Sequence, residues 1–237
     1  MSTADELVAM RVLKYIMAVE QVLSNIRLDD VKHPEVREVI NLSKAYLNDS
    51  KYYFSSKDYI TSLSCIAYAE GLLDALRILG IINFYWERPK VRKVMVGGTF
   101  DIIHPGHIHY LSEASKLGLV YAVVARDSTV RRIKGKEPVN DELTRLEVVN
   151  SLKFVYSAVL GNEENIFKSI EVVKPDVILL GPDQPVDEQS ISKYLDVIGL
   201  KAEVLRLSSR YKSEIASTTN IINKILKLYC GNYIMCK

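Results

Sequence analysis

The apolar pattern changes near residue 92, and this change constrains the fold more than any other feature. From there, short apolar runs rich in β-branched residues alternate with segments long enough to form helices. Such an alternation predicts a parallel sheet that helices cover on both faces, a Rossmann-like α/β domain. The expected strands are 94–96, 119–125, 155–160, 177–180 and 204–207, and the expected helices lie near 107–117, 141–153, 163–173, 187–198 and 217–229.

The residues before this change carry a helical pattern without strand signals. Apolar side chains recur every three or four positions over residues 8–26, so one face of that segment is apolar. A second helix is expected over about 34–47, because proline is favoured in a first helical turn, and a third over about 57–79, which Gly80 ends. We therefore predict a small all-α helical domain, built as an antiparallel hairpin or bundle.

The polar, proline-containing stretch around residue 89 marks the expected boundary between the two domains. The predicted domains are 1–88, a helical bundle or hairpin for docking or oligomerisation, and 89–237, the α/β domain. The tyrosines and the moderate apolarity of the first domain suit packing at an interface, so a homodimer is one expected assembly.

Composition excludes several classes of protein. The net charge of +2 is too small to indicate a nucleic-acid partner. The three cysteines show no metal-ligand spacing, and their odd number favours reduced thiols. The N-terminus lacks the basic and apolar regions of a signal peptide, and no apolar run approaches the roughly 18 residues of a membrane span. We expect a cytoplasmic protein that binds neither nucleic acid nor a membrane.

The segment GGTFDIIHPGH, residues 97–107, lies at the predicted end of the first strand. In α/β sheets ligands bind beyond the carboxyl ends of the strands, near the point where the strand order reverses. Gly97 and Gly98 permit tight backbone geometry, so main-chain N–H groups can approach a phosphate. The segment is neither a dinucleotide fingerprint, since it lacks a third glycine in register, nor a Walker A loop, since no GK[ST] follows.

His104 and His107 stand where the next helix is expected to begin. A helix N-terminus has free N–H groups and attracts anions, and two imidazoles add further hydrogen-bond donors there. Helix-capping or core histidines, or a metal pair at this spacing, are alternative interpretations. No third carboxylate or cysteine ligand is evident nearby, so a role in phosphate binding is favoured and no protein metal site is expected.

Four separated motifs resemble those of the HxGH nucleotidyltransferase superfamily, which is cytidylyltransferase-like. HPGH after GGTFD resembles its signature, and GTFDIIHPGHIHYL is similar to the archaeal FAD synthase and glycerol-3-phosphate cytidylyltransferase branch. ARDSTVRRIKGKEPV, LLGPDQPVDE and SSRYKSEIASTTNII resemble the second-strand segment, base loop and closing motif of archaeal FAD synthases. The resemblance covers about residues 92–229. The helical region resembles a small archaeal domain of unassigned function.

The resemblance implies roles for particular residues. The implied catalytic residues are His104, His107, Lys134 and Arg210. The implied nucleotide-binding residues are these together with Gly98, Thr99, Phe100, Gly181, Asp183, Gln184, Ser217 and Thr218, without Lys134. The implied acceptor-binding residues are Asp101, Asp127, Arg132 and Lys136. A solvated basic loop around residues 131–136, a plain N-cap at Ser217 and a surface ion pair for Arg145 are the alternatives.

The implied reaction is attack of an acceptor phosphate on the α-phosphorus of a nucleoside triphosphate, with release of pyrophosphate. The resemblance implies ATP as donor and FMN as acceptor, which gives FAD, with Mg²⁺ held mainly by the nucleotide phosphates. A cytidylyltransferase that uses CTP and glycerol 3-phosphate is the first alternative, and a pantetheine-phosphate adenylyltransferase fits the motifs less well. A non-catalytic nucleotide-sensing protein is the alternative from another class.

Overall fold

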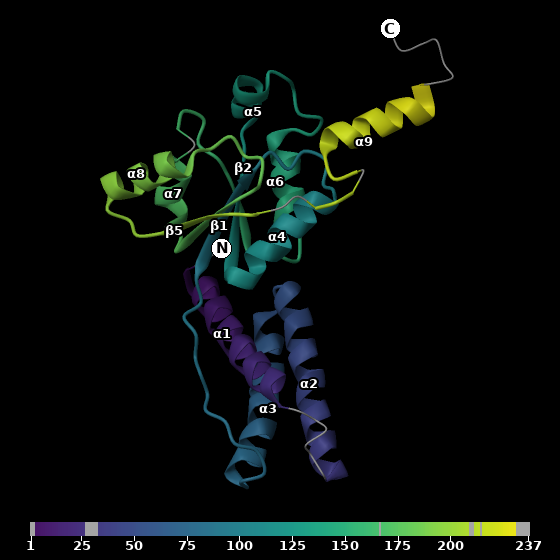
Figure 1. The fold of residues 1–237 in the computed structure, drawn as a ribbon, viewed down its shortest axis with the longest axis vertical. Helices are drawn as coiled ribbons and strands as arrows, with labels where there is room; N and C mark the ends of the chain where they lie inside the picture. Colours follow the sequence, from purple (N-terminus) through teal and green to yellow (C-terminus); the bar gives the residue numbers. More distant parts are fainter. Residues whose placement is uncertain (1–2, 27–32, 166, 209–210, 214, 231–237) are drawn as a thin grey trace. The chain divides into compact units, whose positions relative to one another are not determined.

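The computed structural model describes residues 3–26, 33–165, 167–208, 211–213 and 215–230. The chain folds into two compact units, Met1–Val91 and Arg92–Lys237 (Figure 1). The first unit is helical, and the second contains a parallel sheet with helices, as the apolar pattern predicts. Among the described residues, no helix combines the length and the apolar character that a membrane span needs.

The helical unit consists of α1 (Thr3–Asn25), α2 (Pro34–Ser55) and α3 (Tyr59–Ile78). Its core is formed by apolar side chains from one face of each helix, all fully buried. They include Val12, Val19, Ile40, Ile66 and Leu73. The recurrence of apolar residues every three or four positions thus corresponds to a common core, as expected for amphipathic helices.

The second helix is longer than its predicted end at residue 47. Leu47 and Ser50 are buried, so the chain still packs against α3 beyond the predicted end. The helix ends at Ser55, and Asp58 then caps α3 by accepting a hydrogen bond from the Thr61 N–H at 3.1 Å. The prediction failed because Asn48, Asp49 and Ser50 indicate a turn in sequence, whereas tertiary packing keeps them helical.

The α/β unit is built on a five-stranded parallel sheet in the order β3-β2-β1-β4-β5. The strands are β1 (Lys93–Gly98), β2 (Leu119–Val124), β3 (Ser157–Leu160), β4 (Val177–Leu180) and β5 (Glu203–Arg206). The helices are α4 (Pro105–Leu117), α5 (Asp127–Lys134), α6 (Glu142–Asn150), α7 (Lys168–Val173), α8 (Glu188–Ile198), α9 (Thr218–Ile225) and the π-helical turn η2 (Leu226–Cys230). β1 lies at the centre, with β2 and β4 on either side, so the strand order reverses there.

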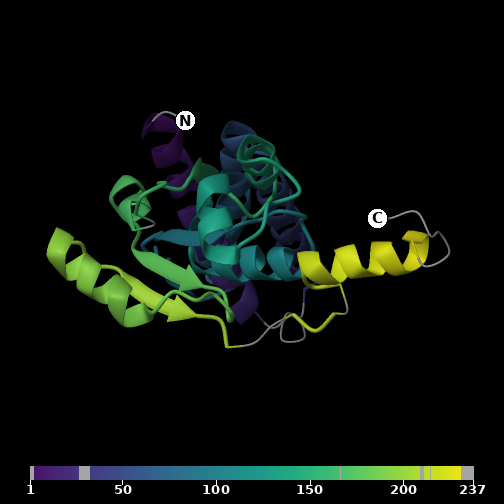
Figure 2. The same cartoon turned by 90° about the horizontal axis from the view of Figure 1, so that it is seen from above.

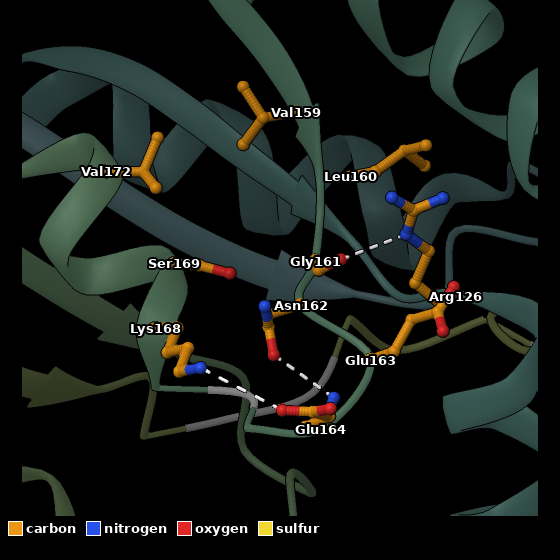
Figure 3. Close-up of a pocket in the computed structure, with 10 residues that line it drawn as sticks. All are labelled: Arg126, Val159, Leu160, Gly161, Asn162, Glu163, Glu164, Lys168, Ser169 and Val172. Carbon is orange, nitrogen blue, oxygen red and sulfur yellow. Dashed lines mark hydrogen bonds and ion pairs between the residues drawn. The ribbon is translucent and has the colours of Figure 1, made fainter.

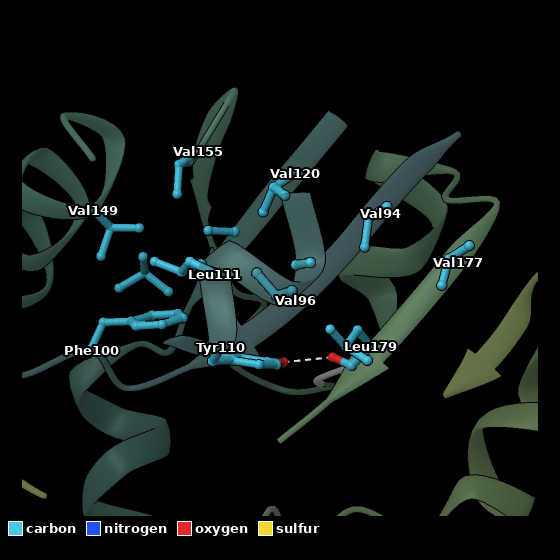
Figure 4. Packing of buried hydrophobic residues seen from close by; sticks show 13 residues of the cluster. Val94, Val96, Phe100, Tyr110, Leu111, Val120, Val149, Val155, Val177 and Leu179 are labelled. Carbon is cyan, nitrogen blue, oxygen red and sulfur yellow. Dashed lines mark hydrogen bonds between the residues drawn. The ribbon is translucent and has the colours of Figure 1, made fainter. Parts of the chain in front are cut away.

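Helices α4 and α6 cover one face of the sheet, where Leu111 and Val149 pack against Val96, Val120 and other valines of the strands (Figure 4). Helices α7 and α8 lie together on the other side (Figures 1 and 2), and the Tyr194 hydroxyl of α8 donates to Glu171 of α7. The central strands are therefore buried on both faces, which explains why they read as continuous apolar runs.

Residues 127–134 form a helix, α5, where the sequence predicts a basic loop. Val130 is buried on one side of this short helix, and Gly135 ends it in the left-handed region with φ 64°. The basic residues fill its last turn, where positive charge interacts favourably with the helix dipole. The basic segment is thus a rigid helix end, and only some of its cations face the site.

Candidate active site

A cavity of about 660 Å³ lies at the carboxyl ends of the strands. We call it the nucleotide cavity. The loops after β1, β2, β4 and β5 contribute to it, so it occupies the switch point that the strand order creates. The predicted site residues that line it are Gly98, Thr99, Phe100, His104, His107, Lys134, Gly181, Asp183, Gln184 and Ser217.

The loop after β1 has a constrained backbone. Phe100 adopts a positive φ of 51°, which is rare for a residue other than glycine, and its side chain is almost fully buried. A Cβ atom on Gly98 would lie 2.9 Å from the Phe100 ring. Gly98 therefore allows the ring to fold back beneath the strand end, and the loop leaves the sheet over this ring.

The two histidines form one unit at the start of α4. His104 is the N-cap, and its Nδ1 accepts a hydrogen bond from the His107 N–H at 3.3 Å. The two rings stack with centroids 3.7 Å apart, and the Phe100 ring lies 5.1 Å from that of His107. The capping interpretation and the phosphate interpretation of His104 coexist here, because capping uses Nδ1 and leaves Nε2.

Burial, followed by the nearby charges of His104 and Lys134, lowers the pKa of His107 to about 3. Burial also lowers the pKa of His104. Both imidazoles are therefore neutral at physiological pH. A neutral imidazole still donates one hydrogen bond, so the pair can stabilise charge that develops on a phosphate without a fixed positive charge of its own.

Lys134 supplies the cation of this cavity from the last turn of α5. It is half-buried, and burial followed by the charge of Lys136 lowers the pKa of its ammonium group. Arg132 and Lys136 are exposed and do not line the nucleotide cavity, and Arg131 pairs with Glu137 at 3.1 Å. The structure thus brings Lys134 to the histidines but leaves the neighbouring cations outside.

The loop after β4 is held against β1 by Gln184. The Gln184 side chain accepts a hydrogen bond from the Gly181 N–H at 3.1 Å and donates one to the Gly97 carbonyl. Arg206, at the end of β5, donates to the carbonyls of Gly181 and Gln184, both at 3.0 Å. A base bound beside this loop would therefore meet a rigid wall. The sequence analysis missed Arg206, which resembles any charged residue at a strand end.

The two predicted acceptor-binding aspartates are engaged in loop structure. The Asp101 carboxylate accepts hydrogen bonds from the backbone N–H groups of Val139 and Asn140, both at 2.9 Å. Asp127 pairs with Arg145 at 2.6 Å. Neither aspartate lines the nucleotide cavity. Both hold together the loops that surround it.

Arg145 is fully buried, so its interpretation as a surface ion pair is wrong. Besides Asp127, its guanidinium donates to the carbonyls of Thr99, Ala125 and Asn140 at 2.5, 2.7 and 3.0 Å. These carbonyls belong to the loops after β1 and β2 and to the segment before α6. One side chain thus connects the loop that carries the histidine motif to the loop that leads into α5. Its burial in α6 could not be read from the sequence.

The closing segment reaches the cavity at the start of α9. Ser217 caps α9, and its hydroxyl accepts a hydrogen bond from the Asn220 N–H at 3.1 Å. A Cβ atom on Gly106 would lie 3.0 Å from the Ala216 carbonyl, so this glycine allows the segment to approach α4. Thr218 begins α9 but does not line the nucleotide cavity. Arg210 lies outside the described residues.

Comparisons with known proteins match the two units separately. A family described as cytidylyltransferase-like matches residues 95–224, and a family described as a protein of unknown function, DUF357, matches residues 14–82. The FAD synthase of Methanothermus fervidus is 49% identical over 146 residues, which are 60% of this chain and 100% of the relative.

Two further relatives show the same pattern of coverage. The FAD synthase of Methanohalobium evestigatum is 45% identical over 139 residues, which are 58% of this chain and 91% of the relative. That of Pyrococcus abyssi is 44% identical over 140 residues, which are 58% of this chain and 95% of the relative. The likeness therefore includes nearly the whole length of each relative.

Proposed function

This chain belongs to the cytidylyltransferase-like family and is a nucleotidyltransferase, and from that premise we propose that it converts ATP and FMN to FAD and pyrophosphate. The observation that carries the proposal is the pair of neutral, stacked histidines on the wall of the nucleotide cavity. The FAD synthases among its relatives support FMN as the acceptor.

The reaction needs no protein nucleophile. A phosphate oxygen of FMN attacks the α-phosphorus of ATP, the bond from that phosphorus to the bridging oxygen of the β-phosphate breaks, and pyrophosphate leaves with the electron pair. Charge accumulates on the oxygens around the α-phosphorus during transfer. We propose that His104 and His107 donate hydrogen bonds to these oxygens, that Lys134 neutralises the leaving pyrophosphate, and that the loop of residues 181–184 holds the adenine.

We propose that Mg²⁺ binds together with the nucleotide. Asp183 is the only carboxylate among the described residues that line the nucleotide cavity. No group of three or more histidine, cysteine, aspartate or glutamate side chains among the described residues could hold a metal ion. This donor set fits a metal held mainly by phosphate oxygens, where it would neutralise their charge.

The test is a pyrophosphate-release assay with Mg²⁺ that crosses ATP and CTP with FMN, glycerol 3-phosphate and phosphopantetheine. We expect release from ATP with FMN alone, with FAD identified as the product by chromatography. Release with CTP and glycerol 3-phosphate would replace the substrates while keeping the class of reaction. Tight ATP binding without release in any combination would indicate a nucleotide-sensing protein instead.

We further propose that the helical unit mediates association between copies of the chain. Several large apolar side chains remain exposed on it, among them Leu7, Ile60, Ile78, Leu79 and Tyr85. The curated relatives above match about three-fifths of this chain over nearly their whole length. Light scattering on the full chain and on residues 92–237 should give a dimer for the first and a monomer for the second. Equal states would contradict this role.

A further inference from the structure

A second cavity, of about 480 Å³, lies beyond the end of β3 (Figure 3). We call it the side cavity. Its walls come from the end of β3, from the loop that follows and from α7. The residues that line it are Arg126, Val159, Leu160, Gly161, Asn162, Glu163, Glu164, Lys168, Ser169 and Val172. None of the histidines and none of the residues of the 181–184 loop is among them.

The side cavity adjoins the nucleotide cavity. Arg126, Gly161, Asn162 and Ser169 line both spaces, so a ligand that passes these residues can occupy both at once. Arg126 is held in place, since its guanidinium donates to the Gly161 carbonyl at 3.1 Å and to Glu142 at 2.5 Å. The connection between the cavities therefore has a fixed wall on the Arg126 side.

The Ser169 hydroxyl indicates that the side cavity binds a ligand. Ser169 is only 4% exposed, and its Oγ atom has no hydrogen-bond partner among the described residues. Figure 3 shows this hydroxyl turned from α7 toward the space in front of Asn162. A buried hydroxyl without a partner is costly unless a ligand or water completes it.

The walls combine apolar and polar groups in a particular arrangement. Val159 and Leu160 supply apolar surface from the strand, and Val172 supplies it from α7. Asn162 lies opposite, and its side-chain oxygen accepts hydrogen bonds from the N–H groups of Glu164 and Asn165 at 3.1 and 2.9 Å. This leaves the Asn162 amide nitrogen for the cavity, on the side of Ser169 (Figure 3).

We propose that the side cavity receives the planar ring of the acceptor, a flavin, while the acceptor's phosphate reaches the nucleotide cavity. This inference rests on the proposed function. A flavin ring has apolar faces for Val159 and Leu160 and one polar edge with carbonyl and N–H groups for Asn162 and Ser169. A small phospho-alcohol would leave the side cavity empty and Ser169 unpartnered.

The test compares two substitutions of serine by leucine. In Ser169→Leu the new side chain enters the side cavity, whereas in Ser192→Leu it lies on the exposed face of α8 and touches neither cavity. Binding of FMN and of riboflavin, which has the same ring without the phosphate, is followed by flavin fluorescence. Binding of ATP is measured separately, and circular dichroism checks the fold of each variant.

We expect Ser169→Leu to weaken binding of FMN and riboflavin by the same factor, at least about tenfold, because both lose the place of the ring. ATP binding should stay unchanged, and Ser192→Leu should resemble the wild type throughout. Should the leucine variant fail to fold, Ser169→Ala removes only the hydroxyl and should weaken both flavins by about two- to tenfold.

The inference is overturned if the wild type forms FAD while Ser169→Leu binds FMN as tightly as the wild type does. It is also overturned if the variant loses FMN but keeps riboflavin, which would place the ring elsewhere. If the wild type binds no flavin and releases no pyrophosphate from ATP and FMN, the proposed function itself fails, and the flavin assignment fails with it.

Discussion

The two units of the chain treat buried hydroxyl groups differently. In the helical unit, Ser43, Ser50 and Ser62 are fully buried, and each hydroxyl donates to a backbone carbonyl across the α2–α3 contact. In the α/β unit, Thr129 and Ser169 are each 4% exposed, line a cavity, and have no hydrogen-bond partner among the described residues.

This difference separates groups that build the fold from groups that await a ligand. A buried hydroxyl with a partner stabilises the contact it spans, whereas one without a partner lowers stability until something binds it. We therefore expect substitutions at paired polar groups to cost stability and those at the unpaired cavity hydroxyls to cost binding instead.

Arg145→Met should cause the largest loss of stability, because the change breaks a fully buried ion pair with Asp127. It also leaves the carbonyls of Thr99, Ala125 and Asn140 without their partner. The free energy of unfolding should fall by roughly 3–5 kcal/mol, measured by urea denaturation.

The matched control is Arg131→Met, which removes a surface ion pair with Glu137 on the neighbouring helix. Exposed pairs contribute little, so this variant should unfold like the wild type. A small and equal loss in both variants would mean that Arg145 does not hold the loops of the site together.

Gly98→Ala should have the next largest effect. Its Cβ would lie 2.9 Å from the buried Phe100 ring, and the ring has no room to withdraw into the packed core. Overpacking of this kind costs about 1–3 kcal/mol. Gly97→Ala is the control from the same strand, since its Cβ meets nothing within 4 Å. If thermal unfolding shows the same shift for both, the contact with Phe100 does not constrain the loop.

The comparison of hydroxyls is sharpened by Ser50→Ala and Thr129→Val. The first removes a donor to the Ser62 carbonyl and should lower the free energy of unfolding by about 1–2 kcal/mol. The second replaces a hydroxyl that has no partner among the described residues by a methyl group of similar size, so stability should stay equal or rise. Chemical denaturation of both variants decides the point. A larger loss for Thr129→Val would reverse the distinction.

A smaller effect should appear as pH dependence of stability. Burial lowers the folded pKa of His107 to about 3 from the ordinary 6.5, so below pH 6.5 the unfolded chain binds a proton that the folded chain does not. Stability is then lost as pH falls from 6.5 toward 3. Between pH 7 and 5.5 this single group should remove about 1 kcal/mol. His107→Ala should flatten that slope in denaturation curves, and an unchanged slope would contradict the burial of a neutral imidazole.

The sequence predicts the layout of the site where a residue's chemistry is local. The parallel sheet follows from the apolar runs, and the position of His104 and His107 at the start of α4 follows from Pro105 and the preceding strand. These features depend on backbone preferences over a few residues, and therefore they can be read without tertiary information.

Features that depend on distant partners were not predictable in this way. Arg206 holds a loop about 20 residues away in sequence, and Arg145 contacts Thr99 from α6. Nothing near Asp101 in the sequence shows that Val139 and Asn140 occupy its carboxylate. Charged side chains read alike whether they face solvent, substrate or a backbone carbonyl, and only the fold distinguishes these cases.

The central claim is that the two histidines stabilise nucleotidyl transfer in the nucleotide cavity. The most direct test measures pyrophosphate release from ATP and FMN by His107→Ala, with ATP binding measured on the same variant. His33→Ala, at the N-cap of α2 in the helical unit, is the control. We predict that kcat falls by about 10²–10³-fold in His107→Ala, while ATP binding and the control stay near wild type. Unchanged turnover, or loss of ATP binding as the main effect, would contradict the claim.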